Sequence, residues 1–504
     1  MHSLVLLPIL IPFLAAVCAL GVRRRPLFQR VLGLMGTAAL FAASIVLLVV
    51  VWRDGIQVMQ IGGWPAPFGI TIVADLFSAL MVLLAGAIGF LVTVYSLASI
   101  DLRRQAFGYY PLLLLLLMGV CGAFLTGDIM NLYVWFEVML IASFVLMTLG
   151  GEEPQIEGGF KYVTINLFSS TLFLTATGIM YGLTGTLNMA HLSQALRTAP
   201  YPGVVSIVSM LFLIAFGIKA AVFPLYFWLP ASYHTPPVAV SALFVGLLTK
   251  VGVYALVRVF TLLFVQDTAF THSLILVIAG CTMVSGVLGA VAQRELRRIL
   301  SFLVVSHIGF AIMGLGVFTP RGLAGSVFYI IEDIIVLTTL FMISGIVRQL
   351  GGSYDLKRLG GLYTSAWPVA FLFFIPALSL SGIPPLSGFF AKLALVQAAL
   401  AAGHYGIVAT ALSVSVVTLF IVAKIWTEVF WKRRPQLNQT RSDVDGAVQG
   451  RVLPWTMLLP VVGLVLLSVL IGLGAQGVFT LAMRVAEQLL DPTAYVAHVL
   501  RAVP

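Results

Sequence analysis

Seven ionisable side chains lie well inside apolar stretches of this 504-residue chain: Glu137, Lys219, Lys250, His307, Glu332, Asp333 and Lys392. A charged side chain at the centre of a bilayer costs about 2.5 to 3.5 kcal/mol even on a lenient insertion scale, so each must be compensated by pairing or by water. Lysine is suited to proton transfer there, because burial and a neighbouring carboxylate act in opposite directions on its charge. The alternative is that each side chain belongs to a structural ion pair or reaches toward the membrane surface.

Glu137 is the natural partner of Lys219, because a paired ammonium stays charged until its partner is removed or neutralised. Loss of that pair would push a proton from Lys219 toward Lys250. Such a relay needs groups within hydrogen-bond reach, directly or through one or two waters.

The remaining candidates are less decisive. An unperturbed histidine has a pKa of about 6.5, so His307 could pass a proton at neutral pH or equally hold two helices together. Glu332 and Asp333 point about 100° apart on a helix, so we expect one to line a route and the other to pair elsewhere. Asp75 and Arg258 lie nearer span ends and are interpreted as interfacial or snorkelling residues.

The composition places these residues in a membrane protein, since 61% of the residues are hydrophobic and only 9% are charged. The chain is predicted to be an all-α polytopic protein with one transmembrane domain over residues 1–504 and no separate soluble domain. Fourteen apolar windows have the roughly 20 residues that a helix needs to cross a bilayer. They are 3–20, 32–52, 70–97, 109–126, 129–149, 160–184, 204–228, 238–262, 272–292, 300–318, 323–347, 366–398, 405–430 and 454–474.

Basic residues collect in alternate loops between these windows. One predicted face carries Arg23, Arg24, Arg25, Arg30, Arg103, Arg104, Arg294, Arg297, Arg298, Arg348, Lys357, Arg358, Lys432, Arg433, Arg434, Arg441 and Arg451. The other face carries Arg53, Arg197, Arg258 and Arg321. The positive-inside rule makes the first face cytoplasmic and puts both termini outside, in a cell (plasma) membrane. The net charge of +10 is therefore read as a topology signal, and no nucleic-acid partner is expected.

Two windows are interrupted by helix breakers: Phe223-Pro224 with Pro230, and Gly382-Ile383-Pro384-Pro385. Proline and glycine free backbone groups that lipid cannot satisfy, so these helices should be broken and face protein or water. They are five windows apart, an odd offset that inverts orientation. We therefore predict two inverted five-helix repeats, residues 109–262 and 272–430, with broken helices seven and twelve. Residues 478–491 have an amphipathic pattern and should lie at the interface or against a partner.

No cofactor and no metal are expected. Cys18, Cys121 and Cys281 each fall in an apolar window without a CxxC pair or clustered histidines. The GxGxxG match at 472–477 follows an apolar window and no βαβ unit, so nucleotide binding is not expected.

Three motifs carry a family resemblance: Trp135-Phe136-Glu137, Gly217-Ile218-Lys219 with Phe223-Pro224-Leu225, and Ser381-Gly382-Ile383-Pro384-Pro385. They resemble the antiporter-like subunits shared by Mrp-type multisubunit sodium/proton antiporters, respiratory complex I and membrane-bound hydrogenases. The segments 231–237 and 247–254 look most like the D-subunit branch of the Mrp type. The resemblance implies fourteen helices, inverted repeats and proton transfer along a polar mid-membrane axis.

The resemblance also assigns roles: Glu137 matches the fifth-helix glutamate, Lys219 the seventh-helix lysine, Lys250 the eighth-helix relay residue and Lys392 the twelfth-helix lysine. The chain departs from many relatives in the eleventh helix, where Glu332-Asp333 replaces histidines and a lysine. This departure makes Glu332 or Asp333 a candidate carrier or cation contact.

The resulting hypothesis is a proton-translocating subunit of a Na⁺/H⁺ antiporter complex. Its expected partners are the other subunits, H⁺, Na⁺ and the lipid bilayer, and no chemical catalysis by the chain itself is expected. One alternative is a proton-pumping subunit of a redox complex, of the complex I or hydrogenase type. A further alternative is a stand-alone solute carrier, although no substrate-recognition cluster is evident.

Overall fold

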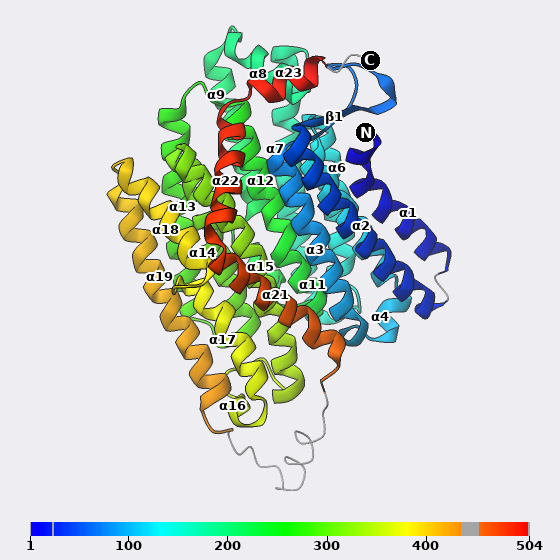
Figure 1. The fold of residues 1–504 in the computed structure, drawn as a ribbon, viewed down its shortest axis with the longest axis vertical. Helices are drawn as coiled ribbons and strands as arrows, with labels where there is room; N and C mark the ends of the chain where they lie inside the picture. Colours follow the sequence, from blue (N-terminus) through cyan, green and yellow to red (C-terminus); the bar gives the residue numbers. More distant parts are fainter. Residues whose placement is uncertain (1, 23–24, 435–452, 502–504) are drawn as a thin grey trace.

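The computed structural model describes residues 2–22, 25–434 and 453–501. Four residues of the predicted basic face, Arg23, Arg24, Arg441 and Arg451, lie outside the described residues. The described part is a helical bundle with one small hairpin of strands (Figure 1).

The first half of the chain contains α1 (Leu7–Gly21), α2 (Pro26–Asp54), α3 (Leu76–Ser99), α4 (Leu102–Ala106), α5 (Tyr109–Leu125), α6 (Ile129–Met147), α7 (Glu153–Thr184), α8 (Met189–Ala195), α9 (Pro202–Ala220), α10 (Trp228–Ser232), α11 (Val238–Leu243) and α12 (Thr249–Leu262). The second half contains α13 (Thr268–Val291), α14 (Leu296–Val317), α15 (Pro320–Gly351), α16 (Leu362–Ser365), α17 (Trp367–Ser381), α18 (Ser387–Ala401), α19 (Tyr405–Trp426), α21 (Trp455–Leu473), α22 (Ala475–Leu490) and α23 (Thr493–Arg501). The remaining elements are the 3₁₀ turns η1 (His2–Leu6), η2 (Ile61–Gly63) and η3 (Leu196–Thr198), the π-helical turns η4 (Phe244–Leu248) and η5 (Thr427–Trp431), and the strands β1 (Gln57–Gln60) and β2 (Thr71–Ala74).

The predicted polytopic helical fold is confirmed. Within the described residues, twelve helices are long and apolar enough to cross a membrane. The shorter apolar helix α5 covers the fourth predicted window, and α17 and α18 together cover the twelfth. The count of fourteen spans and the inverted repeats stay predictions.

The third predicted window is wrong at its start. Residues 71–74 form β2, which pairs antiparallel with β1 from Gln57 opposite Ala74 to Gln60 opposite Thr71. α3 begins only at Leu76, where the Asp75 carboxylate and the Ser78 hydroxyl form a capping box. A short apolar run does not distinguish a buried strand from a helix, so the prediction extended the helix over it.

Both expected helix interruptions are present. α9 ends at Ala220, and the chain turns through Ala221, whose φ is 61°, before α10. α17 ends at Ser381 and turns through Gly382, whose φ is 86°, before α18 begins at Ser387. The prolines that follow each turn prevent the helix from continuing.

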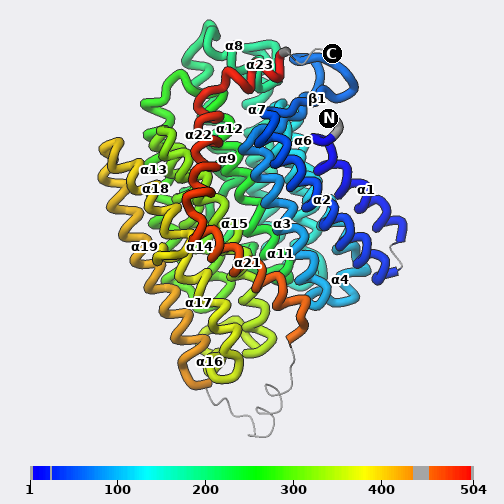
Figure 2. Tube along the Cα trace, in the orientation of Figure 1, coloured from blue at the N-terminus to red at the C-terminus, as the bar shows by residue number. Residues whose placement is uncertain are grey.

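The 32-residue helix α15 forms the centre of the second half, and nearly all of it is buried. It packs against α14, α17, α18, α21 and α22. Figure 2 shows α21 crossing the bundle obliquely and α22 continuing upright along it. α22 covers most of the segment predicted to be amphipathic and runs along the bundle (Figure 2). Its apolar side, with Ala482, Val485 and Leu489, is buried there.

The first and last described elements, η1 and α23, lie at one end of the molecule. Figure 1 shows η1, β1, α8 and α23 at that end, with α4 and α16 at the opposite end. The predicted cytoplasmic loops that contain α4 and α16 therefore lie far from both chain ends.

Candidate functional site

Lys219 lies one residue before the end of α9, where the helix break begins, and only 7% of it is exposed. Its Nζ donates to the Ser170 hydroxyl at 3.1 Å and to the Asn166 carbonyl at 3.5 Å, both on α7. The ammonium also lies 5.4 Å from the centre of the Phe136 ring on α6. Neutral oxygens and an aromatic face therefore compensate this charge.

Glu137, the predicted partner of Lys219, makes no direct ion pair with it within the described residues. Glu137 Oε1 is buried without a hydrogen-bond partner, and the carboxylate acts on Lys219 through space. A cavity of about 20 Å³ beside Lys219 is lined by Asn166 and Tyr233, among others. That volume holds about one water molecule. The two charges are close enough to interact electrostatically but are not locked together.

Lys250 makes a deeply buried ion pair with Asp333. Its Nζ lies 2.8 Å from Asp333 Oδ2, and the two side chains are 1% and 0% exposed. The same ammonium donates to the Val245 carbonyl at 2.9 Å, within the π-helical turn η4. π-helical turns inside α-helices occur often at functional sites. This pair joins α12 to α15.

His307 from α14 completes the cluster around Asp333. Its Nδ1 lies 3.6 Å from Asp333 Oδ1 and hydrogen-bonds to the Tyr329 hydroxyl. Both rings are buried and stacked. The structure therefore brings Lys250, Asp333 and His307 into one contact group.

Glu332 turns toward a different set of helices. Its Oε1 accepts a hydrogen bond from the Ser379 hydroxyl on α17 at 3.0 Å, and its Oε2 has no hydrogen-bond partner. Lys392 on α18 donates to the Leu380 carbonyl at 2.8 Å and to the Ser415 hydroxyl at 3.1 Å. Lys392 makes no direct ion pair within the described chain. It interacts electrostatically with Glu332 and, more weakly, with Asp333.

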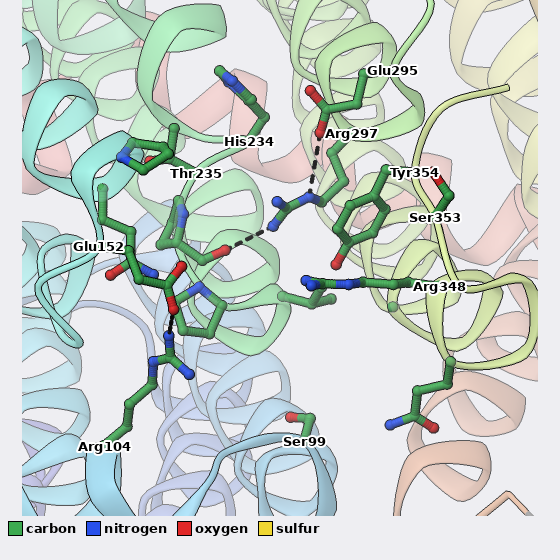
Figure 3. A pocket seen from close by; sticks show the side chains of 18 of the residues that line it. Ser99, Arg104, Glu152, His234, Thr235, Glu295, Arg297, Arg348, Ser353 and Tyr354 are labelled. Carbon is green, nitrogen blue, oxygen red and sulfur yellow. Dashed lines mark hydrogen bonds and ion pairs between the residues drawn. The ribbon is translucent and has the colours of Figure 1, made fainter. Parts of the chain in front are cut away.

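A polar basin of about 760 Å³ opens near the end of the molecule that carries α4 (Figure 3). Arg297 donates to the Pro236 carbonyl at 2.7 Å on one side, and Arg104 pairs with Glu152 on the other. The Tyr354 ring lies beside the guanidiniums of Arg297 and Arg348, at 4.1 and 5.0 Å.

The titratable groups of the basin are perturbed by their burial. Burial, with the neighbouring Arg297 and Arg298, lowers the pKa of His234 to about 4. Burial raises the pKa of Glu295 above its ordinary range, although the same two guanidiniums oppose the rise. The basin reaches Gly345, which is twelve residues, or about 18 Å of helix, from Asp333 along α15.

One buried charge cluster was misjudged from the sequence. Arg258 holds Asp75 through two contacts, at 2.6 and 2.8 Å, and both side chains are nearly inaccessible. Arg258 also donates to the Tyr254 hydroxyl at 3.1 Å, which in turn donates to the Phe124 carbonyl at 2.7 Å. Asp75 and Arg258 therefore form a buried bidentate pair and are not interfacial or snorkelling side chains. The sequence does contain a signal for this cluster. Lys250, Tyr254 and Arg258 are spaced i, i+4, which puts Arg258 on the same face of α12 as the buried Lys250.

Within the described residues, no group of three His, Cys, Asp or Glu side chains could hold a metal ion. Cys18, Cys121 and Cys281 are not joined in disulfides.

Comparison with known proteins decides the family. The family model for NADH:quinone oxidoreductase/Mrp antiporter transmembrane proteins matches residues 126–418, more than half of the chain. The chain belongs to this family. The match includes both helix breaks and all seven predicted site residues, so the Mrp antiporter family resemblance drawn from the motifs is confirmed.

Relatives within the Mrp antiporter family match over nearly the whole length. The chain is 45% identical to the D subunit of the Na⁺/H⁺ antiporter of Alkalihalophilus pseudofirmus, over 99% of this chain and 100% of that protein. It is 40% identical to the D subunit of the Na⁺/H⁺ antiporter of Bacillus subtilis, with the same coverage.

Solved structures agree. A chain of the Mrp complex from Dietzia sp. DQ12-45-1b matches with a TM-score of 0.91 and 32% identity, over 99% of each chain. A chain of respiratory complex I from Thermus thermophilus matches with a TM-score of 0.79 and 26% identity, over 97% of this chain and 99% of that one.

Proposed function

We propose that this chain is the proton-translocating subunit of a multisubunit Na⁺/H⁺ antiporter, moving protons along a row of buried residues at mid-membrane. The row contains Glu137, Lys219, Lys250, His307, Asp333, Glu332 and Lys392. The buried pair of Lys250 with Asp333 carries the proposal, because it joins the helices of the first predicted repeat to α15 in the second.

The free-energy cost of placing ionisable side chains in an apolar interior supports a role for this row in proton transfer. The seven ionisable groups come from six helices, and six of them are buried while Glu137 is half-buried. Each costs free energy in an apolar interior unless it is paired or solvated. Lys219 and Lys392 have no carboxylate in direct contact among the described residues, yet each interacts electrostatically with one. Lysines held by neutral oxygens near a carboxylate can lose and regain a proton without a large rearrangement.

The proposal includes the repeat organisation and the sidedness. Residues 109–262 and 272–430 would be the inverted repeats, with the breaks after α9 and after α17 in corresponding helices. Both chain ends would lie outside, at the end opposite α4 and α16. The polar basin would then open on the cytoplasmic side, where protons could enter.

The other subunits of an Mrp-type complex are the proposed partners, since the relatives are named as antiporter subunits and one matching structure is an Mrp complex. A second candidate is a pumping subunit of a redox complex. It is favoured by the match to the membrane-bound sulfane sulfur reductase, with a TM-score of 0.90 at 25% identity. The higher identity to the D subunits of Na⁺/H⁺ antiporters supports the antiporter as the first candidate.

The test is sodium-dependent proton exchange by the assembled complex in vesicles. Lys219→Ala and Glu137→Ala should each abolish exchange, and Lys392→Ala should impair it similarly, while assembly is retained. Lys161→Ala is the matched control, because Lys161 is an exposed lysine paired with Glu157 on the surface of α7. Wild-type exchange by Lys219→Ala would contradict the proposed path. Co-purifying flavin or iron–sulfur subunits would instead indicate the redox complex.

A further inference from the structure

Three buried hydroxyls form a continuous hydrogen-bonded row that starts at Glu332. The Ser379 hydroxyl donates to Glu332 Oε1 at 3.0 Å and lies 3.1 Å from the Ser387 hydroxyl. Ser387 lies in turn 3.0 Å from the Ser468 hydroxyl. None of the three serines is more than 1% exposed. The row therefore connects α15 to α17, α18 and α21 without access to bulk solvent.

The backbone at the second helix break holds this row in place. The Gly388 amide, at the start of α18, donates to the Ser379 hydroxyl oxygen at 3.0 Å. α21 approaches the same turn closely at Gly472, where a Cβ atom would lie 2.5 Å from the Pro385 carbonyl oxygen. The glycine that begins the GxGxxG match thus has a packing role, since it lets α21 reach the break.

The polarity of the row is linked to the charge on Glu332. A hydroxyl has one proton to donate, and each of these serines has a neighbour on the row. When Glu332 is ionised, Ser468 donates to Ser387, Ser387 to Ser379 and Ser379 to Glu332. Protonation of Glu332 on Oε1 would reverse all three donations. Hydrogen bonds in such a chain polarise one another, so the row favours the ionised carboxylate more than one serine alone would.

The ionisable groups that act on Glu332 come from several helices. Asp333 and Tyr329 share α15 with it, Lys250 lies on α12 and Lys392 on α18. His307 on α14 reaches this set through Asp333. The two helices that supply Ser379 and Ser468, α17 and α21, contain no ionisable side chain. Hydroxyls are thus the means by which these two helices influence the carboxylate.

We propose that Ser379, Ser387 and Ser468 are positioning residues that fix Glu332 Oε1 and leave Oε2 to exchange a proton with Lys392. In that exchange the Lys392 Nζ–H bond breaks and a Glu332 Oε2–H bond forms, directly or through one water. The ammonium becomes a neutral amine, the carboxylate becomes a carboxylic acid, and no other reactant is needed. The inference rests on the proposed function, because it assigns a role to Glu332 within the proton path.

The experiment measures sodium-dependent proton exchange against pH for the assembled complex in vesicles. Ser379→Ala removes a hydrogen bond that favours the ionised carboxylate. It should slow exchange about tenfold and move the acid limb of the pH profile about one unit higher. Ser387→Ala and Ser468→Ala should shift the acid limb in the same direction. The shift should be smaller for Ser387→Ala than for Ser379→Ala, and smallest for Ser468→Ala. Ser344→Ala is the matched control, because the buried Ser344 hydroxyl donates only to the Phe341 carbonyl of its own helix, at 2.6 Å.

Glu332→Gln separates this inference from the proposed function. If Glu332→Gln exchanges protons like the wild type, Glu332 is not on the path and the proposed path fails there. If it is impaired, Ser379→Ala should cause no further loss in the Glu332→Gln background, since the serine acts through the carboxylate. An additive loss, or a wild-type pH profile for Ser379→Ala, would overturn the positioning role alone. If Ser379→Ala does not co-purify with its partners, the other two serines supply the test. An unshifted pH profile for both Ser387→Ala and Ser468→Ala would then overturn the positioning role.

Discussion

At the scale of single residues, two adjacent acids on α15 contact different parts of the molecule. Asp333 pairs with Lys250 and lies near His307, whereas Glu332 is held by Ser379. Their side chains leave the helix about 100° apart, so neighbouring positions can serve different helices. Because like charges this close disfavour joint ionisation, a proton gained by one acid eases the ionisation of the other. This coupling would let the acids pass a signal between the two halves.

Asp333→Asn should be strongly destabilising, because it leaves the buried Lys250 ammonium without a counter-charge. Removing one partner of a buried pair costs about 3 to 5 kcal/mol. The expected result is a lower thermal unfolding midpoint of the purified complex and loss of proton exchange. The double variant Lys250→Met with Asp333→Leu should recover the midpoint but not the exchange, since packing replaces the pair and neither position can then carry a proton. Recovery of exchange by the double variant would contradict a role for the pair in proton transfer.

The positions of the buried charges could be predicted from the sequence, because each stands out in an apolar window. Their partners could not. Arg258 and Asp75 are 183 residues apart, so their contact depends on how α3 and α12 pack. The same holds for Lys219, because the sequence does not reveal that the Ser170 hydroxyl and the Asn166 main-chain carbonyl of α7 contact its ammonium.

At the scale of elements, the two broken helices end in the same backbone conformation but with different residues. Ala221 follows the last residue of α9 with φ 61°, and Gly382 follows the last residue of α17 with φ 86°. A left-handed conformation costs a residue with a Cβ roughly 1 to 2 kcal/mol, and glycine does not incur this penalty. The breaks themselves were predictable from proline and glycine. β2 and the course of α22 were not, since short apolar and amphipathic patterns fit several placements.

Gly382→Ala should therefore lower stability, and Ala221→Gly should leave it unchanged or raise it. A Cβ at Gly382 would also approach Lys392 Cδ to 3.0 Å, so the variant should impair exchange as well. The expected difference between the two variants is about 1 to 2 kcal/mol, read from thermal unfolding of the purified complex. Equal midpoints for the two variants would show that neither turn is sensitive to a Cβ.

At the scale of the whole molecule, the polar basin gathers segments from both halves and makes stability depend on pH. The pKa of His234 is lowered to about 4 in the folded protein, against about 6.5 for an ordinary histidine. The contribution of the neutral imidazole to stability is therefore fully present at pH values above about 6.5. That contribution is lost as pH falls from 6.5 toward 4, and roughly 2 kcal/mol of it is lost between pH 7 and pH 5. His234→Gln should therefore lose less thermal stability between pH 7 and pH 5 than the wild type. The comparison cancels Glu295, whose raised pKa acts in the opposite direction. A larger loss for His234→Gln would contradict this assignment.

The arrangement of the chain ends makes the proposed sidedness testable on the intact complex. His498 on α23 and Arg358 in the segment before α16 are both exposed. Figure 1 shows α23 and α16 at opposite ends of the molecule. With both termini outside, His498→Cys should react with a membrane-impermeant thiol reagent added to intact cells. Arg358→Cys should react only after the membrane is opened. Labelling of both variants in opened membranes is the control that each thiol is accessible to the reagent. Seventeen basic residues against four predict this result through the positive-inside rule. Labelling of Arg358→Cys alone in intact cells would show the opposite orientation in the membrane. The polar basin would then lie on the outer side, and protons would enter it from there.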